Sequence, residues 1–514
     1  MRHVWLPLAI TCAGALGIAA CAQVVGLADY QKVDCLDDCA DAEGADVANV
    51  PPGTDGSSEA GPTSCTGTTV TCGGACVDLT ADPDNCGACG AACGASACCK
   101  SACVDTKTSN ANCGACGVTC LGTESCSAGA CRPAPLGNGS DGPLAITADK
   151  TIDTVLAGGL AIAAGAQSAT VAATAGFTAG DLVMLHQTRG AGAGTYELTT
   201  VTKVDATSLT LAHAVVHAFS STGDARAQVV RVPQYTTVSI AAGATLSAPA
   251  WDGTSGGILA FEANGAVDVS GAIDMTGRGF RGYSHAGTCA GGARYACTNA
   301  DTADGFAGES SAGPAVASNA AIASGGGGGQ DGQDCGAGAG GGHGTAGTNG
   351  TDGTGLLCRN APQLGGAAGG TVGVPDLTAS LLFGGAGGEG GGDEDGAYPG
   401  AGGNGGGIVS IAAQSITVTG AIRANGAPGT DGVQIDAGCG GTGCGMGAGG
   451  GGAGGAVLIH AAAAASVGAS LVTATGATGG ACSCGAMPGG VGGSGRIALA
   501  GTVTGTTTPD FVAK

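Results

Sequence analysis

The chain has 514 residues, a formal net charge of −22, 107 glycines and only 3% aromatic residues. The negative charge argues against a nucleic-acid partner, because phosphate contacts are made mainly by Lys and Arg. The scarcity of bulky apolar side chains excludes one large hydrophobic core and predicts several small units, each stabilised in a different way.

The first twenty residues have the pattern of an export signal. Arg2 and His3 precede a mostly apolar run at residues 4–16, which is shorter than the ~20 apolar residues of a membrane-spanning helix. Small residues then lead to Cys21 in the sequence Ile18-Ala19-Ala20-Cys21. This segment resembles the signal of bacterial lipoproteins, which implies removal of residues 1–20 and a lipid on Cys21. An ordinary signal peptide that is cut elsewhere is the alternative.

The expected partner of the chain is a membrane, which it would contact through the lipid on Cys21. Ala22 follows the cysteine where Asp often retains such proteins in the inner membrane, so we expect an exported protein anchored in the outer membrane. Of 26 cysteines, 24 remain without Cys12 and Cys21, an even number typical of oxidising compartments. Residues 21–64 are acidic and rich in Gly, Ser and Pro, which predicts an extended tether.

Residues 65–131 form a cysteine-rich module with an internal duplication. The spacing C-x3-C-x9-C-x2-C-x3-C begins at Cys72 and recurs 27 residues later at Cys99. These repeats resemble the stigma-specific cysteine-rich family, which implies an extracellular module and no reaction. Disulfides are expected in an exported segment with so small a core, with the connectivity left open. The expected disulfide cysteines are Cys65, Cys72, Cys76, Cys86, Cys89, Cys93, Cys98, Cys99, Cys103, Cys113, Cys116, Cys120, Cys126 and Cys131.

Zinc is the alternative ligand for part of this module. The C-x2-C pairs Cys86/Cys89 and Cys113/Cys116 have a spacing that thiolate zinc sites use. The interval between the pairs is long for a zinc ribbon and the module contains no histidine, so disulfides are favoured.

Residues 138–235 are expected to form a small β barrel or sandwich. The run at residues 182–186 is apolar, and residues 196–204 alternate between apolar and polar side chains, as strands with one buried face do. Three histidines, His186, His213 and His217, are interpreted as solvated surface groups and not as metal ligands.

Residues 236–514 repeat one glycine-rich frame. A Gly-Gly pair precedes short apolar strands that are separated by further glycines, beginning at Ile258, Ile408, Ala456 and Arg496. Such units cannot cover their own apolar faces, but stacked copies can, which predicts a parallel β-solenoid and an all-β chain. Alternation places the following residues in its interior: Ile258, Phe261, Val267, Val269, Ile408, Ile411, Val418, Ile422, Val457, Ile459 and Leu499.

Long glycine-rich inserts separate the expected coils, at about residues 277–405, 426–453 and 477–492. They are either disordered or packed as extended threefold helices, which need the close backbone approach that glycine allows. The region resembles glycine-rich surface and adhesin-type proteins of bacteria. Neighbouring cysteines in the inserts suggest local disulfides: Cys289/Cys297, Cys335/Cys358, Cys439/Cys444 and Cys482/Cys484. Cys482 and Cys484 are too close in sequence to bridge each other easily.

Residues that could carry chemistry are few, and no cofactor, metal site or catalytic cluster is expected. Asp268 and Asp274 lie near Arg278 and Arg281 but are interpreted as solvated. The acidic residues of the inserts are weak calcium candidates, and five aromatic residues are candidate sugar platforms. The former are Asp331, Asp334, Asp352, Asp393, Asp395 and Asp431; the latter are Trp251, Phe261, Phe280, Tyr283 and Tyr295.

Two functions are therefore consistent with the sequence. The favoured one is a lipid-anchored structural or adhesive surface protein that is not an enzyme. The alternative is a carbohydrate-active or carbohydrate-binding β-solenoid protein, related in function to polysaccharide lyases or hydrolases, with a glycan as its partner.

Overall fold

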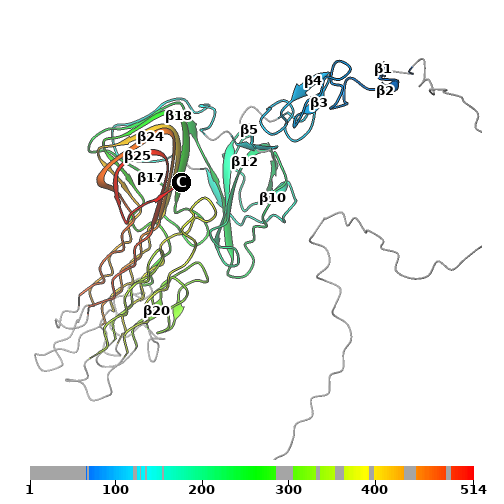
Figure 1. Ribbon diagram of the computed structural model, residues 1–514. Helices are drawn as coiled ribbons and strands as arrows, with labels where there is room; N and C mark the ends of the chain where they lie inside the picture. Colours follow the sequence, from blue (N-terminus) through cyan, green and yellow to red (C-terminus); the bar gives the residue numbers. More distant parts are fainter. Residues whose placement is uncertain are drawn as a thin grey trace, which may run out of the picture. The chain divides into compact units, whose positions relative to one another are not determined.

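The computed structural model describes a chain built from β-strands and glycine-rich extended segments (Figure 1). No helix is present among the described residues, and none there could cross a membrane. The all-β expectation is confirmed. The described residues, which all belong to one compact unit, Pro62–Lys514, are 65, 69–119, 124–127, 129–133, 136–152, 155–284, 305–330, 336–353, 364–392, 399–432, 447–481 and 488–514.

The cysteine-rich module consists of short antiparallel hairpins held by disulfides. Its strands are β1 (Val70–Cys72) with β2 (Ala75–Val77), β3 (Ala97–Cys99) with β4 (Ala102–Val104), and β5 (Glu124–Ser127) with β6 (Ala130–Pro133). The duplication is repeated in the pairing, since Cys72–Cys89 and Cys99–Cys116 both span 17 residues. The other bonds are Cys65–Cys76, Cys86–Cys98, Cys93–Cys103 and Cys113–Cys126.

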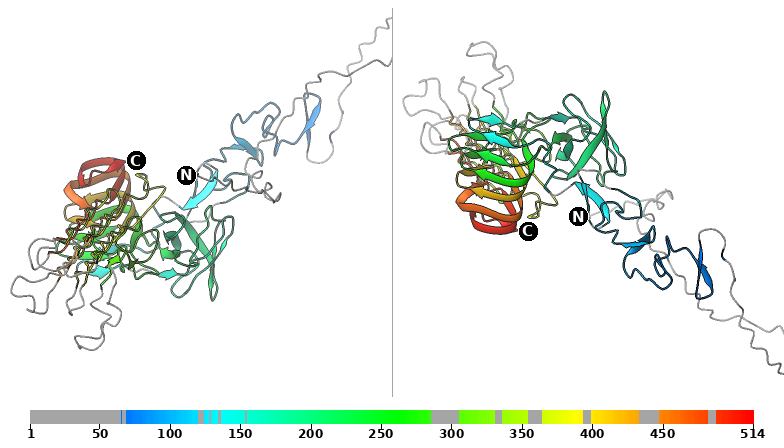
Figure 2. Two further views of the ribbon diagram at one scale, coloured as in Figure 1. Left: turned by 90° about the horizontal axis from the view of Figure 1, so that it is seen from below. Right: turned by 90° about the horizontal axis from the view of Figure 1, so that it is seen from above.

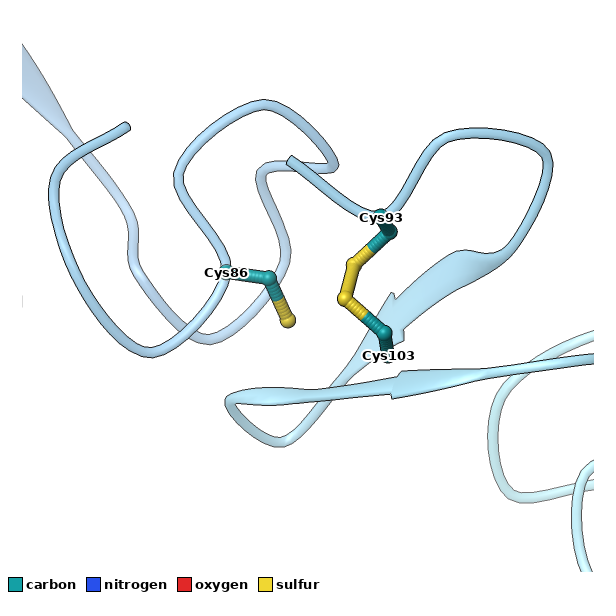
Figure 3. Close-up of side chains that lie close together, drawn as sticks. All are labelled: Cys86, Cys93 and Cys103. Carbon is teal, nitrogen blue, oxygen red and sulfur yellow. A yellow bond between two sulfur atoms is a disulfide. The ribbon is translucent and has the colours of Figure 1, made fainter. Parts of the chain in front are cut away.

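Among the described residues, one group of cysteine sulfurs is spaced closely enough to hold a metal ion, but its members are disulfide-bonded. The sulfurs of Cys86, Cys93 and Cys103 lie within 4.8 Å of one another (Figure 3). Cys93 is bonded to Cys103 and Cys86 is bonded to Cys98, so none of them is a thiolate that could ligate zinc. Cys120, the side chain of Cys131 and the cysteines of the tether and the inserts lie outside the described residues.

Next in the fold is a six-stranded antiparallel sheet. The strand order is β10 (Ser168–Thr170), β13 (Ser208–Leu211), β12 (Tyr196–Val204), β11 (Leu182–Arg189), β14 (Arg226–Arg231) and β9 (Leu156–Gly158). Strand β11 is buried along its whole length because both of its faces are covered. Val183 and Leu185 join the unit's own core, whereas Leu182 and Met184 pack towards the solenoid.

The remaining long strands form a parallel solenoid in which successive coils pair in register (Figure 2). Strands β7 and β8 precede the antiparallel unit and yet pair with β16 and β17, so the first coil begins before residue 236. The solenoid strands are β7 (Leu144–Ile146), β8 (Lys150–Thr151), β15 (Gln234–Tyr235), β16 (Val238–Ile240), β17 (Thr245–Ser247), β18 (Ile258–Val269), β19 (Ala272–Asp274), β22 (Ile408–Val418), β23 (Ala421–Arg423), β24 (Ala456–Thr473), β25 (Arg496–Thr508) and β26 (Val512–Ala513). Strands β20 (Phe306–Ala307) and β21 (Val316–Ala317) form a separate hairpin.

The predicted interior register is confirmed at most positions. Val269 is 1% exposed in the solenoid core, whereas its neighbour Asp268 is exposed. Ile258 and Ile408 are also buried, but on the outer face of the sheet, so their assignment to the interior was wrong. Successive side chains of a strand point to opposite faces of the sheet. Residues three positions apart, such as Ile258 and Phe261 or Ile408 and Ile411, therefore lie on opposite faces.

The coils also differ from the expected three short strands with glycine corners. Strand β24 continues for 18 residues, and β18 and β22 bend through irregular register without ending. Glycine is required where the coils turn: a Cβ on Gly420 would overlap the carbonyl oxygen of Gly271 in the preceding coil.

The glycine-rich inserts form a bundle of extended segments with a period of three. Residues 384–391 illustrate the pattern, because successive amides donate to three different neighbours. Gly384, Gly387 and Gly390 donate to residues 400–406 at 2.9 Å. Gly385, Gly388 and Gly391 donate to residues 336–342, and Ala386 and Glu389 donate to residues 306–309. A threefold extended helix presents its amides in three directions. The described parts of the inserts are therefore packed as extended threefold helices, the second of the two alternatives left open by the sequence.

Glycine is needed for this packing because each backbone lies directly against its neighbours. A Cβ on Gly450 would overlap the carbonyl oxygen of Ala339, and one on Gly390 would overlap that of Gly447. The backbone hydrogen bonds replace the apolar core that the composition cannot supply, and they satisfy buried peptide groups that would otherwise be costly.

We expect Gly450→Ala to lower the free energy of unfolding by at least about 1–3 kcal/mol, because the added methyl has no room in the bundle. Gly313→Ala is the matched control, since a Cβ there meets nothing within 4 Å. Thermal unfolding of both variants measures the difference. Equal midpoints for the two variants would contradict the close packing.

Candidate functional site

A cleft of about 600 Å³ lies between the outer face of the solenoid and the antiparallel sheet. Strands β18, β22, β24 and β25 form one wall, and β11 and β12 with the segment around His217 form the other. Its lining is mostly apolar, with a few polar groups. The lining residues are Met184, Tyr196, Glu197, Leu198, Val216, His217, Val232, Ala260, Phe261, Glu262, Thr378, Ser410, Ile411, Ala412, Leu458, His460 and Ala500.

The cleft exists because small residues replace large ones on the outer face of the solenoid. Glu262, Ala412, His460 and Ala500 are paired across four successive strands, which places them in one row. Adjacent strands lie ~4.8 Å apart, so Ala412 leaves a gap between Glu262 and His460. Closer to the glycine bundle, Ile258 occupies the same outer face and is covered by apolar side chains.

Glu262 is the most unusual group in the cleft. It is 4% exposed, and its Oε2 has no hydrogen-bond partner among the described residues. Burial in apolar surroundings raises the pKa of Glu262 to about 8. The carboxyl group is therefore mainly protonated at neutral pH and has an O–H to donate to a ligand.

The second carboxyl group in the cleft is already engaged. Glu197 accepts hydrogen bonds from the backbone amides of Val216, at 3.0 Å, and His217, at 2.5 Å. The Nδ1 of His217 lies 2.8 Å from the same carboxylate. The hydroxyl of Tyr196 donates to the carbonyl of Leu377 at 3.2 Å, and burial raises the pKa of Tyr196 to about 12. These contacts fix the wall of the cleft opposite Glu262.

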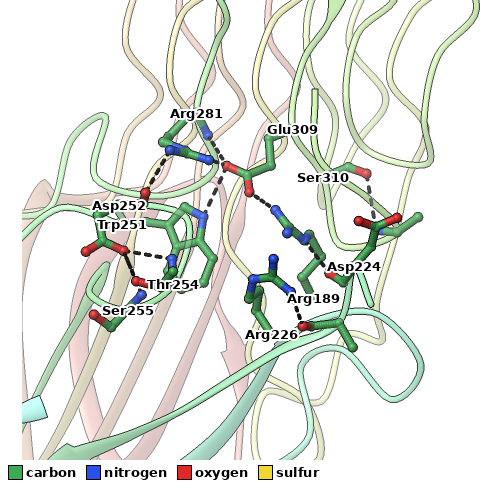
Figure 4. A network of polar contacts seen from close by, with 12 residues as sticks. Arg189, Asp224, Arg226, Trp251, Asp252, Thr254, Ser255, Arg281, Glu309 and Ser310 are labelled. Atoms are coloured by element: carbon green, nitrogen blue, oxygen red, sulfur yellow. Dashed lines mark hydrogen bonds and ion pairs between the residues drawn. The ribbon is translucent and has the colours of Figure 1, made fainter. Parts of the chain in front are cut away.

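A separate buried network joins the antiparallel sheet, the solenoid and the glycine bundle (Figure 4). Its centre is Glu309, which is 1% exposed and forms an ion pair with the nearly buried Arg189 of β11. The other oxygen of Glu309 accepts from Trp251 Nε1 at 3.1 Å and from Arg281 Nε at 3.0 Å. Because both oxygens of Glu309 are occupied, the network is structural.

The catalytic candidates from the sequence do not converge. Asp268 is exposed, and Asp274 pairs with Arg423 of the next coil at 3.3 Å. Arg278 donates to the carbonyl of Ala248, and Arg281 belongs to the Glu309 network. The solvated interpretation holds for Asp268, while Asp274 is half-buried in its ion pair.

Three of the aromatic candidates were wrong as sugar platforms. Trp251, Phe261 and Phe280 are almost completely buried because they fill the cores of the solenoid and of its contact with the antiparallel sheet. Tyr283 is half-buried and stacks on Phe306 at 3.8 Å. Tyr295 lies outside the described residues.

His186 was wrongly interpreted as a surface group. It is fully buried, with Nε2 2.9 Å from the carbonyl oxygen of Leu381, and burial lowers the pKa of His186 to about 4. His213 and His217 are exposed.

The calcium candidates that are described have other partners. Asp352 accepts from the amide of Gly365 at 2.8 Å, and Asp431 accepts from that of Ala481 at 2.6 Å. The remaining candidates, Asp331, Asp334, Asp393 and Asp395, lie outside the described residues.

Glu262 and Glu309 were missed by the sequence analysis. A signal existed for Glu262, because it interrupts the apolar run from Ile258 to Ala263 in a segment predicted as a strand. A buried carboxyl group is costly without a partner or a function. Glu309 lies in an insert, where no strand or helix period marks it as buried.

We expect Glu262→Gln to change the pH dependence of stability. The raised pKa of Glu262 stabilises the fold below about pH 4.5, and this contribution is lost as the pH rises through 8. The variant should match the wild type near pH 4 and exceed it by a few kcal/mol at pH 9, at about 1.4 kcal/mol per pKa unit. Denaturant unfolding across this range tests the prediction, with Asp268→Asn as the control. A constant difference at every pH would contradict it.

Comparison with known proteins identifies the cysteine-rich module and provides remote structural similarities. Residues 56–134 match the Stigma-specific STIG1-like protein family. No curated protein sequence matches the chain. One similar structure is the Gp54 tailspike of Acinetobacter baumannii bacteriophage AP22, in complex with A. baumannii capsular saccharide, at 11% identity over 26% of each chain and a TM-score of 0.16.

A second similar structure is the tailspike gp61 of Pseudomonas phage phi297, at 17% identity and a TM-score of 0.15, over 27% of this chain and 25% of that one. The chain thus spans about a quarter of the length of either tailspike. The family match is confined to the N-terminal part of the chain, which holds the six disulfides of the described residues. Residues 56–134 are therefore a cysteine-rich module similar to the Stigma-specific STIG1-like proteins.

Proposed function

We propose that this chain is an exported surface protein, anchored by lipid on Cys21, that acts in adhesion and not in catalysis. The disulfides of the cysteine-rich module support export, because such bonds persist in oxidising compartments. The export signal and the acidic tether that precede this module support an anchor at one end of the chain and display at the other.

The glycine bundle is the observation that carries the proposal. Its described segments consist mainly of Gly and Ala. Their backbone amides donate hydrogen bonds to several neighbouring segments. The buried Glu309 network fixes the bundle to the solenoid and to the antiparallel sheet. A rigid frame of this kind suits the display of a binding surface, whereas catalysis needs several converging polar groups.

The cleft at Glu262 favours a carbohydrate-binding protein as the second candidate. Glycosidases use two carboxyl groups that flank the scissile bond, one as acid and the other as nucleophile or base. Glu262 has a free oxygen, but both oxygens of Glu197 accept hydrogen bonds from Val216 and His217. The cleft therefore supports binding of a ligand better than its hydrolysis.

The anchor is tested by the variant Cys21→Ala. We expect the variant to leave the membrane fraction and to take up no labelled palmitate, because the acyl chains hold the protein at the membrane. Cys12→Ala, inside the signal segment, is the control and should remain anchored. A Cys21→Ala protein that still sediments with membranes, together with a wild type that takes up no palmitate, would refute the lipid anchor.

A further inference from the structure

We propose that the cleft between Glu262 and His460 binds an uncharged carbohydrate chain, with the Glu262 carboxyl group donating a hydrogen bond to a ligand oxygen. This inference deepens the adhesive function proposed above by naming its ligand class. It is independent of the lipid anchor, because the residues that line the cleft all lie between Met184 and Ala500, far from Cys21 in the sequence.

The size and lining of the cleft fit such a ligand. Its volume of about 600 Å³ lies within the range of about 300–1,000 Å³ that is common for ligand sites. The half-buried Leu198 and Leu458 provide apolar surface for the C–H faces of sugar rings. Ser410, Thr378 and His460 supply polar groups that can pair with sugar hydroxyls.

The state of Glu262 selects for an uncharged partner. Its Oε2 is buried without a hydrogen bond among the described residues, which is costly unless a ligand supplies a partner. A neutral carboxyl group donates to hydroxyl or amide-carbonyl oxygens. Uronic acids are disfavoured, because they would add a negative charge beside Glu197 in a chain with a net charge of −22.

The charged and titratable groups that face Glu262 come from three elements. Tyr196 and Glu197 belong to β12, His460 belongs to β24, and His217 lies on the segment after β13. Ionisation of Glu262 removes its O–H, so we expect binding to weaken as the pH rises from 7 to 9. Any effect of His217 and His460 on the pH dependence of binding is also present in a Glu262→Gln variant. The pH profile of binding by that variant is therefore the reference for the wild type.

Calorimetric titration of the full-length mature protein in detergent tests the proposal. The probes are soluble oligomers of glucose and of N-acetylglucosamine, with oligomers of a uronic acid for comparison. Glu262→Ala should lower the affinity at least about tenfold, whereas Glu262→Gln should stay within about threefold, because its amide still donates. Ala412→Leu should also abolish binding by filling the gap between Glu262 and His460, and Asp268→Asn should have no effect.

Loss of affinity in Glu262→Ala and Ala412→Leu, with retention in Glu262→Gln and a weaker wild type at pH 9, supports the site. Binding that is unchanged in Ala412→Leu, binding of the uronic-acid oligomer alone, or no binding of any probe would overturn it. Cleavage of a bound oligomer would contradict the proposal that the cleft binds its ligand without catalysing a reaction. None of these failures affects the anchor, which Cys21→Ala tests separately.

Discussion

The structure depends on the requirement that buried peptide groups be hydrogen-bonded. A chain with 107 glycines and few aromatic residues lacks the apolar area that stabilises most domains of this length. In the inserts, threefold extended segments meet this requirement by bonding to several neighbours, as Gly384, Gly385 and Ala386 do with three different segments. The absence of side chains that weakens a conventional core is what allows the backbones to approach.

The solenoid and the bundle are consecutive parts of the same coils. Residues 399–407 lead directly into β22, and residues 447–455 lead into β24, so glycine-rich segments change into apolar strands at a fixed boundary. The stacked apolar strands hold these segments in register, and the Glu309 network joins the bundle to the antiparallel sheet. The small outer-face residues near Glu262 then leave the cleft open at the contact of the two sheets.

Much of this arrangement follows from local sequence patterns. Alternation in the strands placed Val269 inside and Asp268 outside, and the cysteine spacing marked the duplicated module. Alternation excludes a shared face for Ile258 and Phe261, which are three positions apart, but it does not say which of the two faces inwards, because both faces of the strand are apolar at that point. His186 and Trp251 were misjudged for a related reason, since their burial depends on segments more than a hundred residues away, around Leu381 and Phe383. The cleft arises from the same long-range contact between the two sheets and has no local signature apart from the isolated Glu262.

The period-three bundle is tested most directly by hydrogen exchange, followed by mass spectrometry, of the peptide that covers residues 447–455. Gly447, Gly450 and Ala453 donate to residues 385–391. Five further amides of this peptide donate to other segments, namely those of Gly449, Gly451, Gly452, Gly454 and Gly455. We predict that these amides exchange far more slowly than those of the same peptide in the unfolded protein. Exchange at the unfolded rate would show that the glycine-rich inserts are disordered and would contradict the bundle.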